Sequence, residues 1–193
     1  MVRGTRYNTG DGLRMALEIG ALPHGQWTGA HATPIDAEAP PYGDRRLTDK
    51  TNRLSYPLGL MLNIHGRRFV DEGEDFQFYT YAKYGAAILN QPRGLAFQLF
   101  DAKAAPLLEG RYRTGTPIVA DSLDALVKQL PLDRTTALEA LQEYNAAVVP
   151  GRFDPSELDG LATKGLALPK SNWAQPLSSP PFSAYPVTCG ITF

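Results

Sequence analysis

The run Thr9-Gly10-Asp11-Gly12 has the residue types best suited to contact a ligand in this 193-residue chain. Two glycines around an acid let the backbone turn tightly and approach a bound molecule closely. Thr9 and Asp11 also carry oxygens that can cap the amides of a following helix. Short Gly/Asp patterns are common at helix N-termini, so the run alone leaves ligand contact and helix capping both open.

Signatures of several other chemistries are missing from the sequence. It has no Gly-x-Gly-x-x-Gly after a strand pattern, no Walker loop, no Gly-x-Ser-x-Gly elbow and no His-Glu-x-x-His pair. The single cysteine, Cys189, excludes an internal disulfide, and the three histidines are too scattered to form a local pair of metal ligands. We therefore expect no metal site and no complete dinucleotide-binding unit.

Composition indicates one soluble globular core. Hydrophobic residues make up 43% of the chain, and the formal net charge is -1 without a lysine/arginine run. Such a balance gives no indication of a basic surface that would bind nucleic acid. No apolar run approaches the roughly 20 residues that cross a bilayer, and the N-terminal residues lack the apolar segment of a secretion signal. The lone cysteine fits a reducing compartment, and we expect a cytoplasmic protein.

Helical periodicity follows the Gly/Asp run. One face of a helix over residues 13–21 would carry Leu13, Ala16, Leu17 and Gly20, and we expect that face to pack on another part of the protein. The stretch from 28 to 57 is rich in Pro, Gly, Asp and Ala without sustained periodicity. It is predicted to be a long irregular segment.

A hairpin and a helix are predicted next. Residues 59–64 and 67–70 are strand-like runs joined by His65-Gly66, a two-residue turn. The acids within 71–75 precede a helix from about 76 to 90. We interpret these acids as stabilising the helix N-terminus rather than as metal ligands.

The rest of the pattern mixes short strands with helices and then turns. The predicted elements are a strand at 94–100, a short helix from Asp101 to about 108, a strand at 117–120, a helix capped by Asp121, a helix from Thr135 or Thr136 through 149, and a turn-rich stretch at 152–181. Because no strand–helix–strand rhythm is present, the pattern favours an α+β fold.

Four segments occur in a fixed order: residues 8–12 with their helix, 29–34, 62–72 and 188–193. Together they resemble motifs of the FAD-dependent succinate dehydrogenase/fumarate reductase flavoprotein family. Residues 72–92, 170–174 and 181–190 resemble more narrowly the tricarballylate dehydrogenase branch. The resemblance covers nearly the whole chain.

The resemblance implies a domain layout. Residues 1–24 would be a remnant of the flavin-binding domain, 25–180 a fumarate reductase-like capping (catalytic) domain, and 181–193 a return segment toward the flavin-binding domain. The Rossmann FAD domain would lie outside this chain. We therefore expect the fragment alone to be inactive and to bind FAD poorly or not at all.

The family's chemistry passes a hydride between a substrate carbon and flavin N5, while a proton is exchanged at the neighbouring carbon. The position matching the family's proton-exchanging arginine is Arg68, with Arg67 the less favoured alternative. The ordinary pKa of arginine lies far above neutral pH, so arginine stays protonated unless its neighbours make proton loss easier. Without the resemblance, Arg68 would be interpreted as a strand cation in a surface ion pair.

The resemblance also implies binding roles. His31 matches a histidine that contacts a substrate carboxylate, although Ala32 interrupts the family's spacing; otherwise it is a loop histidine without a role. Arg53 and Ser55 stand where the family has other substrate contacts and are expected to replace them. Thr9 and Asp11 would contact FAD.

The family's second active-site histidine corresponds to Thr192 or Phe193, which departs from the pattern. Simple fumarate is therefore not the expected substrate.

Two classes of function follow. The first is the substrate cap of an FAD-dependent dehydrogenase acting on CH–CH groups, which in full length oxidises tricarballylate to aconitate. Its partners would be a di- or tricarboxylate substrate, its own flavin domain and a membrane iron-sulfur protein that reoxidises the flavin. Fumarate reductase and 3-ketosteroid dehydrogenase caps are the alternatives within this class. The second class is a non-catalytic binding module, and flanking sequence with flavin-binding glycines would separate the two.

Overall fold

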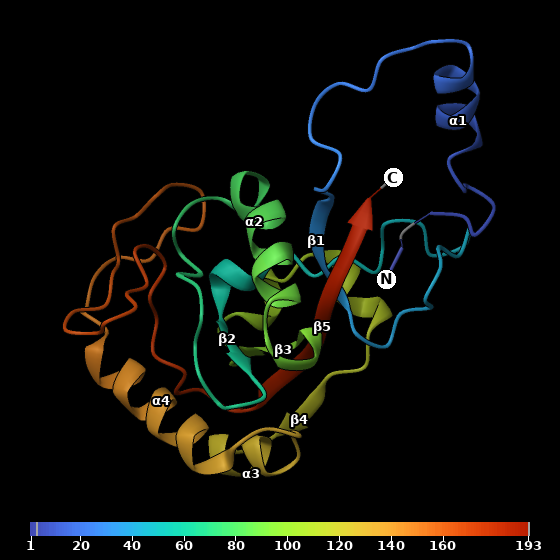
Figure 1. Ribbon diagram of the computed structural model, residues 1–193. Coiled ribbons are helices and arrows are strands. Elements are labelled where there is room, and N and C mark those ends of the chain that lie inside the picture. The colour runs from blue at the N-terminus through green and yellow to red at the C-terminus, as the bar shows by residue number, and fades with distance from the viewer. Residues whose placement is uncertain (3, 193) are drawn as a thin grey trace.

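A five-stranded antiparallel sheet lies at the centre of the protein (Figure 1). The computed structural model describes residues 1–2 and 4–192. The strands are β1 (His31–Asp36), β2 (Leu60–Asn63), β3 (Leu95–Phe100), β4 (Ile118–Ala120) and β5 (Phe182–Thr192). Their order is β1-β5-β3-β2, and β4 also pairs with β5.

Strand β5 holds the sheet together because both of its edges are paired. Residues 183–188 pair with β3 on one edge. On the opposite edge, residues 187–192 pair with β1 and residues 182–184 with β4. The segment that the sequence analysis assigns to a return toward a flavin-binding domain is thus also the central strand of this sheet.

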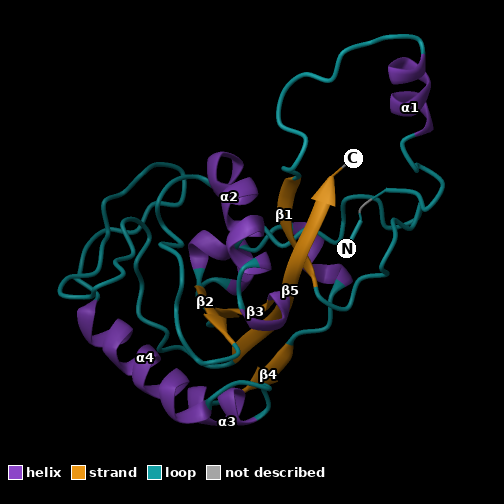
Figure 2. Ribbon diagram, viewed as in Figure 1, coloured by secondary structure: helices purple, strands orange, loops and turns teal. Residues whose placement is uncertain are grey.

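Helices cover both faces of the sheet (Figure 2). Helix α2 (Gln77–Leu89) lies on one face, and α3 (Leu123–Lys128) and α4 (Arg134–Ala147) lie on the other. Helix α1 (Asp11–Glu18) lies away from the sheet (Figure 1). Four short 3₁₀ helices complete the structure: Tyr56–Leu58, Pro92–Gly94, Ala105–Leu107 and Gly110–Thr114.

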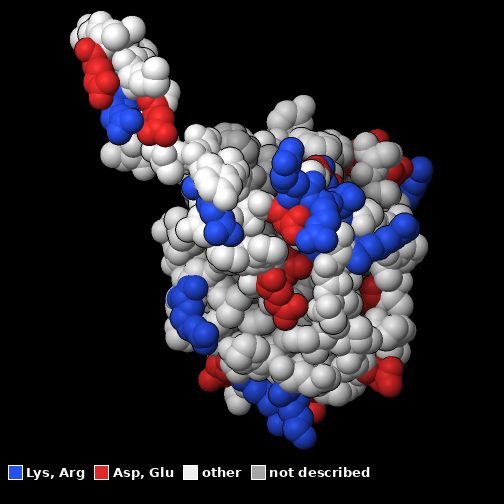
Figure 3. Space-filling model, turned by 90° about the vertical axis from the view of Figure 1, so that its right-hand side faces the viewer, with Lys and Arg blue, Asp and Glu red and all other residues white. Residues whose placement is uncertain are grey.

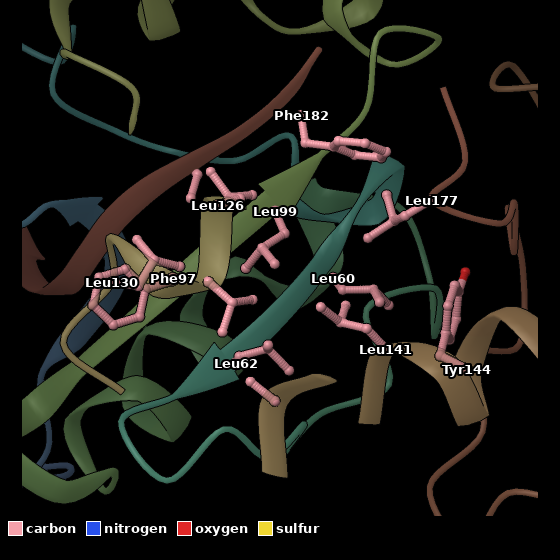
Figure 4. Packing of buried hydrophobic residues seen from close by; sticks show 13 residues of the cluster. Leu60, Leu62, Phe97, Leu99, Leu126, Leu130, Leu141, Tyr144, Leu177 and Phe182 are labelled. Carbon is pink, nitrogen blue, oxygen red and sulfur yellow. The ribbon is translucent and has the colours of Figure 1, made fainter. Parts of the chain in front are cut away.

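Two apolar layers follow from the alternation of side chains along the strands. Leu60 and Leu62 of β2 point toward α4, as Figure 4 shows, whereas Met61 between them packs under α2. In β3, Phe97 likewise belongs to the α3/α4 layer and Ala96 to the α2 layer. Since each fully buried large apolar side chain contributes about 1.5–3 kcal/mol, these layers supply much of the stability.

Several predicted elements are confirmed. The helix expected over 76–90 is α2, and the strands expected near 94–100 and 117–120 are β3 and β4. Helices α3 and α4 also form, but their caps lie next to the expected ones. Ser122 accepts from Ala125 N in α3, and Asp133 accepts from Thr136 N in α4.

The hairpin prediction is wrong. Only its first strand forms, as β2, and its partner is β3, some thirty residues later in the chain. Residues 67–70 are irregular, and Asn63 closes the turn by accepting from His65 N and Arg67 N. The predicted irregular segment from 28 to 57 is wrong in part, because it contains β1.

The acids before α2 do not lie in its first turn. Asp71 accepts from Gly73 N and Ser171 N, and the buried Glu72 accepts from Met61 N. These carboxylates therefore join the turn after β2 to distant segments, which corrects the interpretation of a helix N-terminus.

Helix α1 forms as expected, but neither Thr9 nor Asp11 caps it. Its N-cap is Gly10, with a φ of 83° that glycine tolerates and no side-chain hydrogen bond. Its apolar face is not packed: Leu13 is 61% and Leu17 41% exposed. The expected packing is thus absent from the described chain.

Charges of both signs are interspersed on the face seen in Figure 3, from which α1 projects. Along α1, Arg14 pairs with Asp11 and Glu18 on the exposed surface. Exposed pairs of this kind contribute little to stability. Across residues 1–2 and 4–192, none of the helices has both the length and the apolarity to span a bilayer.

Lys170 joins the turn-rich segment at 152–181 to the sheet. Its buried ammonium donates to Pro57 O at 2.7 Å and to Gly59 O at 2.6 Å. Burial lowers the pKa of Lys170 to about 8, although the charge of Glu72 acts in the opposite direction. A buried cation of this kind costs stability whenever it is protonated.

We predict that Lys170 makes stability increase with pH above 8. The unfolded chain binds this proton up to about pH 10.5 and the folded chain only up to about pH 8, so the free energy of unfolding rises across that interval. The free energy of unfolding is measured by chemical denaturation for the wild type and for Lys170→Met at pH 8 and pH 10. Between these pH values the wild type should gain about 2 kcal/mol relative to the variant. Equal pH dependence in the two proteins would contradict the assignment.

We predict that Gly85→Ala lowers the free energy of unfolding by about 2 kcal/mol. An added Cβ at Gly85 of α2 would lie 2.4 Å from the backbone nitrogen of Thr33 in β1, so the helix must move off the strand. The matched control is Gly12→Ala in α1, where an added Cβ meets nothing within 4 Å. Thermal unfolding should place the control within about 0.5 kcal/mol of the wild type; equal effects would contradict the close packing of α2 on β1.

Candidate functional site

His31 is the predicted substrate-binding residue that reaches the surface, whereas Arg53 and Ser55 are buried. It is the first residue of β1 and pairs with Thr192 at the end of β5. Its Nε2 lies 2.6 Å from the hydroxyl of Tyr81 in α2, and the two rings meet edge to face with centroids 5.2 Å apart. The sheet and α2 together therefore hold an accessible imidazole at one end of the molecule.

The guanidinium of Arg68 donates its hydrogen bonds to groups within the protein. Its guanidinium forms an ion pair with the Glu72 carboxylate, in which Nε donates to Oε1 at 3.1 Å. A second nitrogen donates to Leu168 O at 2.9 Å, and the third donates to Pro169 O at 3.2 Å as well as to Glu72. All three nitrogens thus have protein acceptors, and the side chain is only 7% exposed.

The electrostatics around Arg68 favour its charged form. Burial is the largest single influence and would lower the pKa of Arg68, but the charge and hydrogen bond of Glu72, together with Tyr144 and Asp71, raise the pKa above its ordinary value. A proton donor must release its proton, so this environment opposes the predicted acid–base role. The geometry instead gives Arg68 a structural role, in which it clamps the turn after β2 against the loop at 168–169.

The surface next to Arg68 does not favour an anionic substrate. Arg67 and Arg68 line an open hollow of about 430 Å³ whose α4 side carries Glu139 and Glu143. These carboxylates would repel a substrate carboxylate. Arg67, the alternative proton carrier, is exposed at the rim.

Arg53 is fully buried and belongs to a second internal ion pair. It donates to Asp36 Oδ2 at 2.5 Å, and the two side chains are 0% and 9% exposed. The same guanidinium donates to the backbone carbonyls of Lys50, Asn52 and Arg111. A substrate carboxylate cannot reach it in this structure, although the sequence analysis places Arg53 in the binding site.

Ser55 lies in the same buried network. Its Oγ accepts from Glu109 N at 3.0 Å, and its N donates to the Tyr112 hydroxyl at 2.9 Å. Tyr112 in turn donates to Gln98 Oε1 at 2.5 Å. Ser55 therefore joins the segment after Arg53 to β3, and the structure does not bring it together with His31 in a shared surface site.

Thr9 and Asp11 fit a peripheral contact to a cofactor. Both are exposed on the segment that opens α1, where Thr9 Oγ1 donates to Asp11 Oδ2 at 3.3 Å. Added Cβ atoms at Gly10 and Gly12 meet nothing within 4 Å, so a ligand could approach this backbone. Their hydroxyl and carboxylate oxygens are of the kind that hydrogen-bond sugar-like hydroxyl groups.

A larger open hollow, of about 1130 Å³, lies elsewhere, between residues 4–7 and 40–49. None of the predicted substrate or catalytic residues lines it. In the described part of the chain, no three His, Cys, Asp or Glu side chains converge as metal ligands would. Neither His31 nor Tyr81 lines the larger hollow or the one beside Arg68.

Sequence reasoning missed the partners that decide these roles. Tyr81 lies in the helix predicted over 76–90 but received no role there, and Asp36 lies in the segment predicted to be irregular. Glu72 was assigned to a helix terminus. The spacing of four residues between Arg68 and Glu72 could have signalled a pair, but the link from Arg53 to Asp36 joins elements seventeen residues apart.

Two curated proteins are related to this chain in sequence. A probable fumarate reductase of Shewanella frigidimarina is 30% identical over 149 residues, which cover 75% of this chain and 23% of that protein. A 4-oxocyclohexanecarboxylate 2-dehydrogenase of Sinomonas cyclohexanicum is 26% identical over 160 residues, covering 77% of this chain and 27% of that protein. The chain therefore spans about a quarter of the length of these relatives. No family model matches it.

Solved structures show the same fold. A flavocytochrome c3 fumarate reductase in an open conformation matches all of this chain and 30% of its own, with a TM-score of 0.68 and 23% identity. The 3-ketosteroid delta1-dehydrogenase of Sterolibacterium denitrificans matches 97% of this chain and 36% of its own, with a TM-score of 0.64 and 23% identity. The expected α+β fold is thus confirmed, and the chain has the fold of about a third of these oxidoreductases.

Proposed function

We propose that this chain is the substrate-capping domain of an FAD-dependent oxidoreductase that acts on a small carboxylic acid. The observation that carries the proposal is the exposed imidazole of His31, held by Tyr81 in a chain whose relatives include a probable fumarate reductase. The chain spans about a quarter of the length of those relatives, which fits one domain of a larger enzyme.

FAD, when bound, would accept a hydride from the substrate, and the proton lost from the neighbouring carbon would pass to a base that the residues assigned here do not supply. The chain's own residues then bind and orient the substrate. His31 donates a hydrogen bond to a substrate carboxylate, while Thr9 and Asp11 contact the hydroxyl groups of the cofactor from the adjoining segment. The proposed layout is a flavin-domain remnant at 1–24, the cap at 25–180 and a return segment at 181–193. Held apart from its flavin domain, the chain is expected to be inactive.

Tricarballylate, oxidised to aconitate, is the proposed substrate, with an iron-sulfur membrane protein as the electron acceptor. The resemblance of residues 72–92 and 170–174 to the tricarballylate dehydrogenase branch supports this choice. The second relative is named for a carboxylate-bearing ring, which supports an acid as the substrate class. Fumarate and 3-ketosteroids are the alternative substrates.

The proposal is tested with the whole gene product that contains these 193 residues. Its flavin absorbance is followed without oxygen while tricarballylate, succinate or a 3-ketosteroid is added. We expect bleaching by tricarballylate. Bleaching by the steroid alone would refute the proposed acid substrate, and a gene product that binds no flavin would refute the enzyme assignment.

We predict that His31→Gln raises the KM for tricarballylate in that gene product by about 10-fold, because a hydrogen bond to a charged carboxylate is lost or weakened. The matched control is His24→Gln, whose side chain is exposed on the segment after α1. The control should leave KM unchanged in steady-state assays. An unchanged KM in His31→Gln would remove His31 from the site.

We predict that Arg68→Lys acts on stability rather than on chemistry. Lysine cannot donate to Glu72, Leu168 O and Pro169 O with three separate nitrogens as arginine does. The free energy of unfolding should therefore fall by about 3 kcal/mol. Thermal unfolding and kcat are measured on the same preparation, and kcat per folded molecule should remain within a factor of about 3. An unchanged melting temperature with turnover abolished would establish Arg68 as the proton-exchanging group.

A further inference from the structure

The contact between Tyr81 and His31 is set by the packing of α2 on β1. Gly85 allows the helix backbone to lie against Thr33, and Tyr81 lies one turn before it on the same side. The half-buried Tyr81 thereby reaches the exposed His31 at the start of the strand. A distance of 2.6 Å between the hydroxyl and Nε2 is that of a well-formed hydrogen bond.

This contact is compatible with either neutral form of the imidazole, and the direction of the hydrogen bond decides which form is present. A neutral histidine carries its proton on one ring nitrogen and accepts at the other, and the partner of one nitrogen decides which form is present. If the phenol hydroxyl donates to Nε2, the proton must sit on Nδ1. No protein group among the described residues bonds to that Nδ1, so its N–H is available to a ligand.

We propose that Tyr81 is a positioning residue that donates to Nε2 of His31 and so presents Nδ1–H to a substrate carboxylate. The inference rests on the proposed function, in which His31 binds the acid. It adds that the site needs no charged imidazole. A neutral Nδ1–H can only donate a hydrogen bond. The site therefore favours ligand groups that accept one, such as carboxylates, over groups that donate.

Tyr81→Phe removes the hydroxyl and keeps the ring. His31 then loses the partner that fixes its proton, so the form with the proton on Nε2 becomes populated. In that form Nδ1 carries a lone pair, which repels a carboxylate. The matched control is Tyr79→Phe on the same helix. Tyr79 is 78% exposed, and its hydroxyl has no hydrogen bond in the described structure.

The first measurement is made on the 193-residue chain itself. Long-range proton–nitrogen NMR spectra, recorded near pH 9 where an ordinary imidazole is neutral, report which nitrogen carries the proton. His31 is assigned by the loss of its signals in His31→Gln. We expect Nδ1–H in the wild type and in Tyr79→Phe, and a shift toward Nε2–H in Tyr81→Phe. A wild-type ring protonated at Nε2 would overturn the proposal, whatever the chain's function.

The second measurement is the KM for tricarballylate of the whole gene product. Tyr81→Phe should raise KM about 5- to 10-fold with kcat nearly unchanged, and Tyr79→Phe should change neither. An unchanged KM in Tyr81→Phe would overturn the positioning role. If the NMR result holds while no carboxylate serves as substrate or inhibitor, the proposed function fails and the assigned hydrogen bond stands, so the two failures are distinguishable.

Discussion

The pairing of β5 on both edges is the constraint on which the rest of the structure depends. Its eleven residues bond to β3 on one side and to β1 and β4 on the other, so segments from four distant parts of the sequence meet there. Helix α2 then packs over β1 and the apolar layer beneath it. His31 lies at the surface because β1 begins beside the end of β5, and Tyr81 reaches it because α2 crosses that strand.

Buried charges fix the loops around this sheet. Arg53 with Asp36 and Arg68 with Glu72 are ion pairs that water barely reaches, and Lys170 donates to two carbonyls near the start of β2. Removing one partner of such a pair leaves an uncompensated charge, so these groups have little freedom to serve a substrate. Arg53 and Arg68, which the sequence motifs favour for chemistry, therefore support the loops around the sheet. The accessible imidazole of His31 is the group that we propose to meet a ligand.

Local patterns predicted the helices well and the strands only in part. Helices α2, α3 and α4 and strands β3 and β4 follow from periodicity and nearby caps, which are properties of a few consecutive residues. Strands β1 and β5 contain Pro34, Pro186 and Gly190, which read as turn signals, yet the sheet imposes an extended backbone on them. The hairpin failed because β2 pairs with a distant strand. For the candidate site, the resemblance pointed to His31, which the structure leaves exposed, but the burial of Arg53 and Ser55 depends on contacts that join distant segments, which no local pattern contains.

The central claim is that substrate carboxylates meet this domain at His31 and not at the buried arginines. A structure of the whole gene product with tricarballylate bound tests it most directly. The account predicts a carboxylate oxygen about 2.7–3.0 Å from His31 Nδ1, with Tyr81 still on Nε2 and the Arg68–Glu72 pair intact. A carboxylate bound to Arg68 or Arg53, with either ion pair opened, would contradict it.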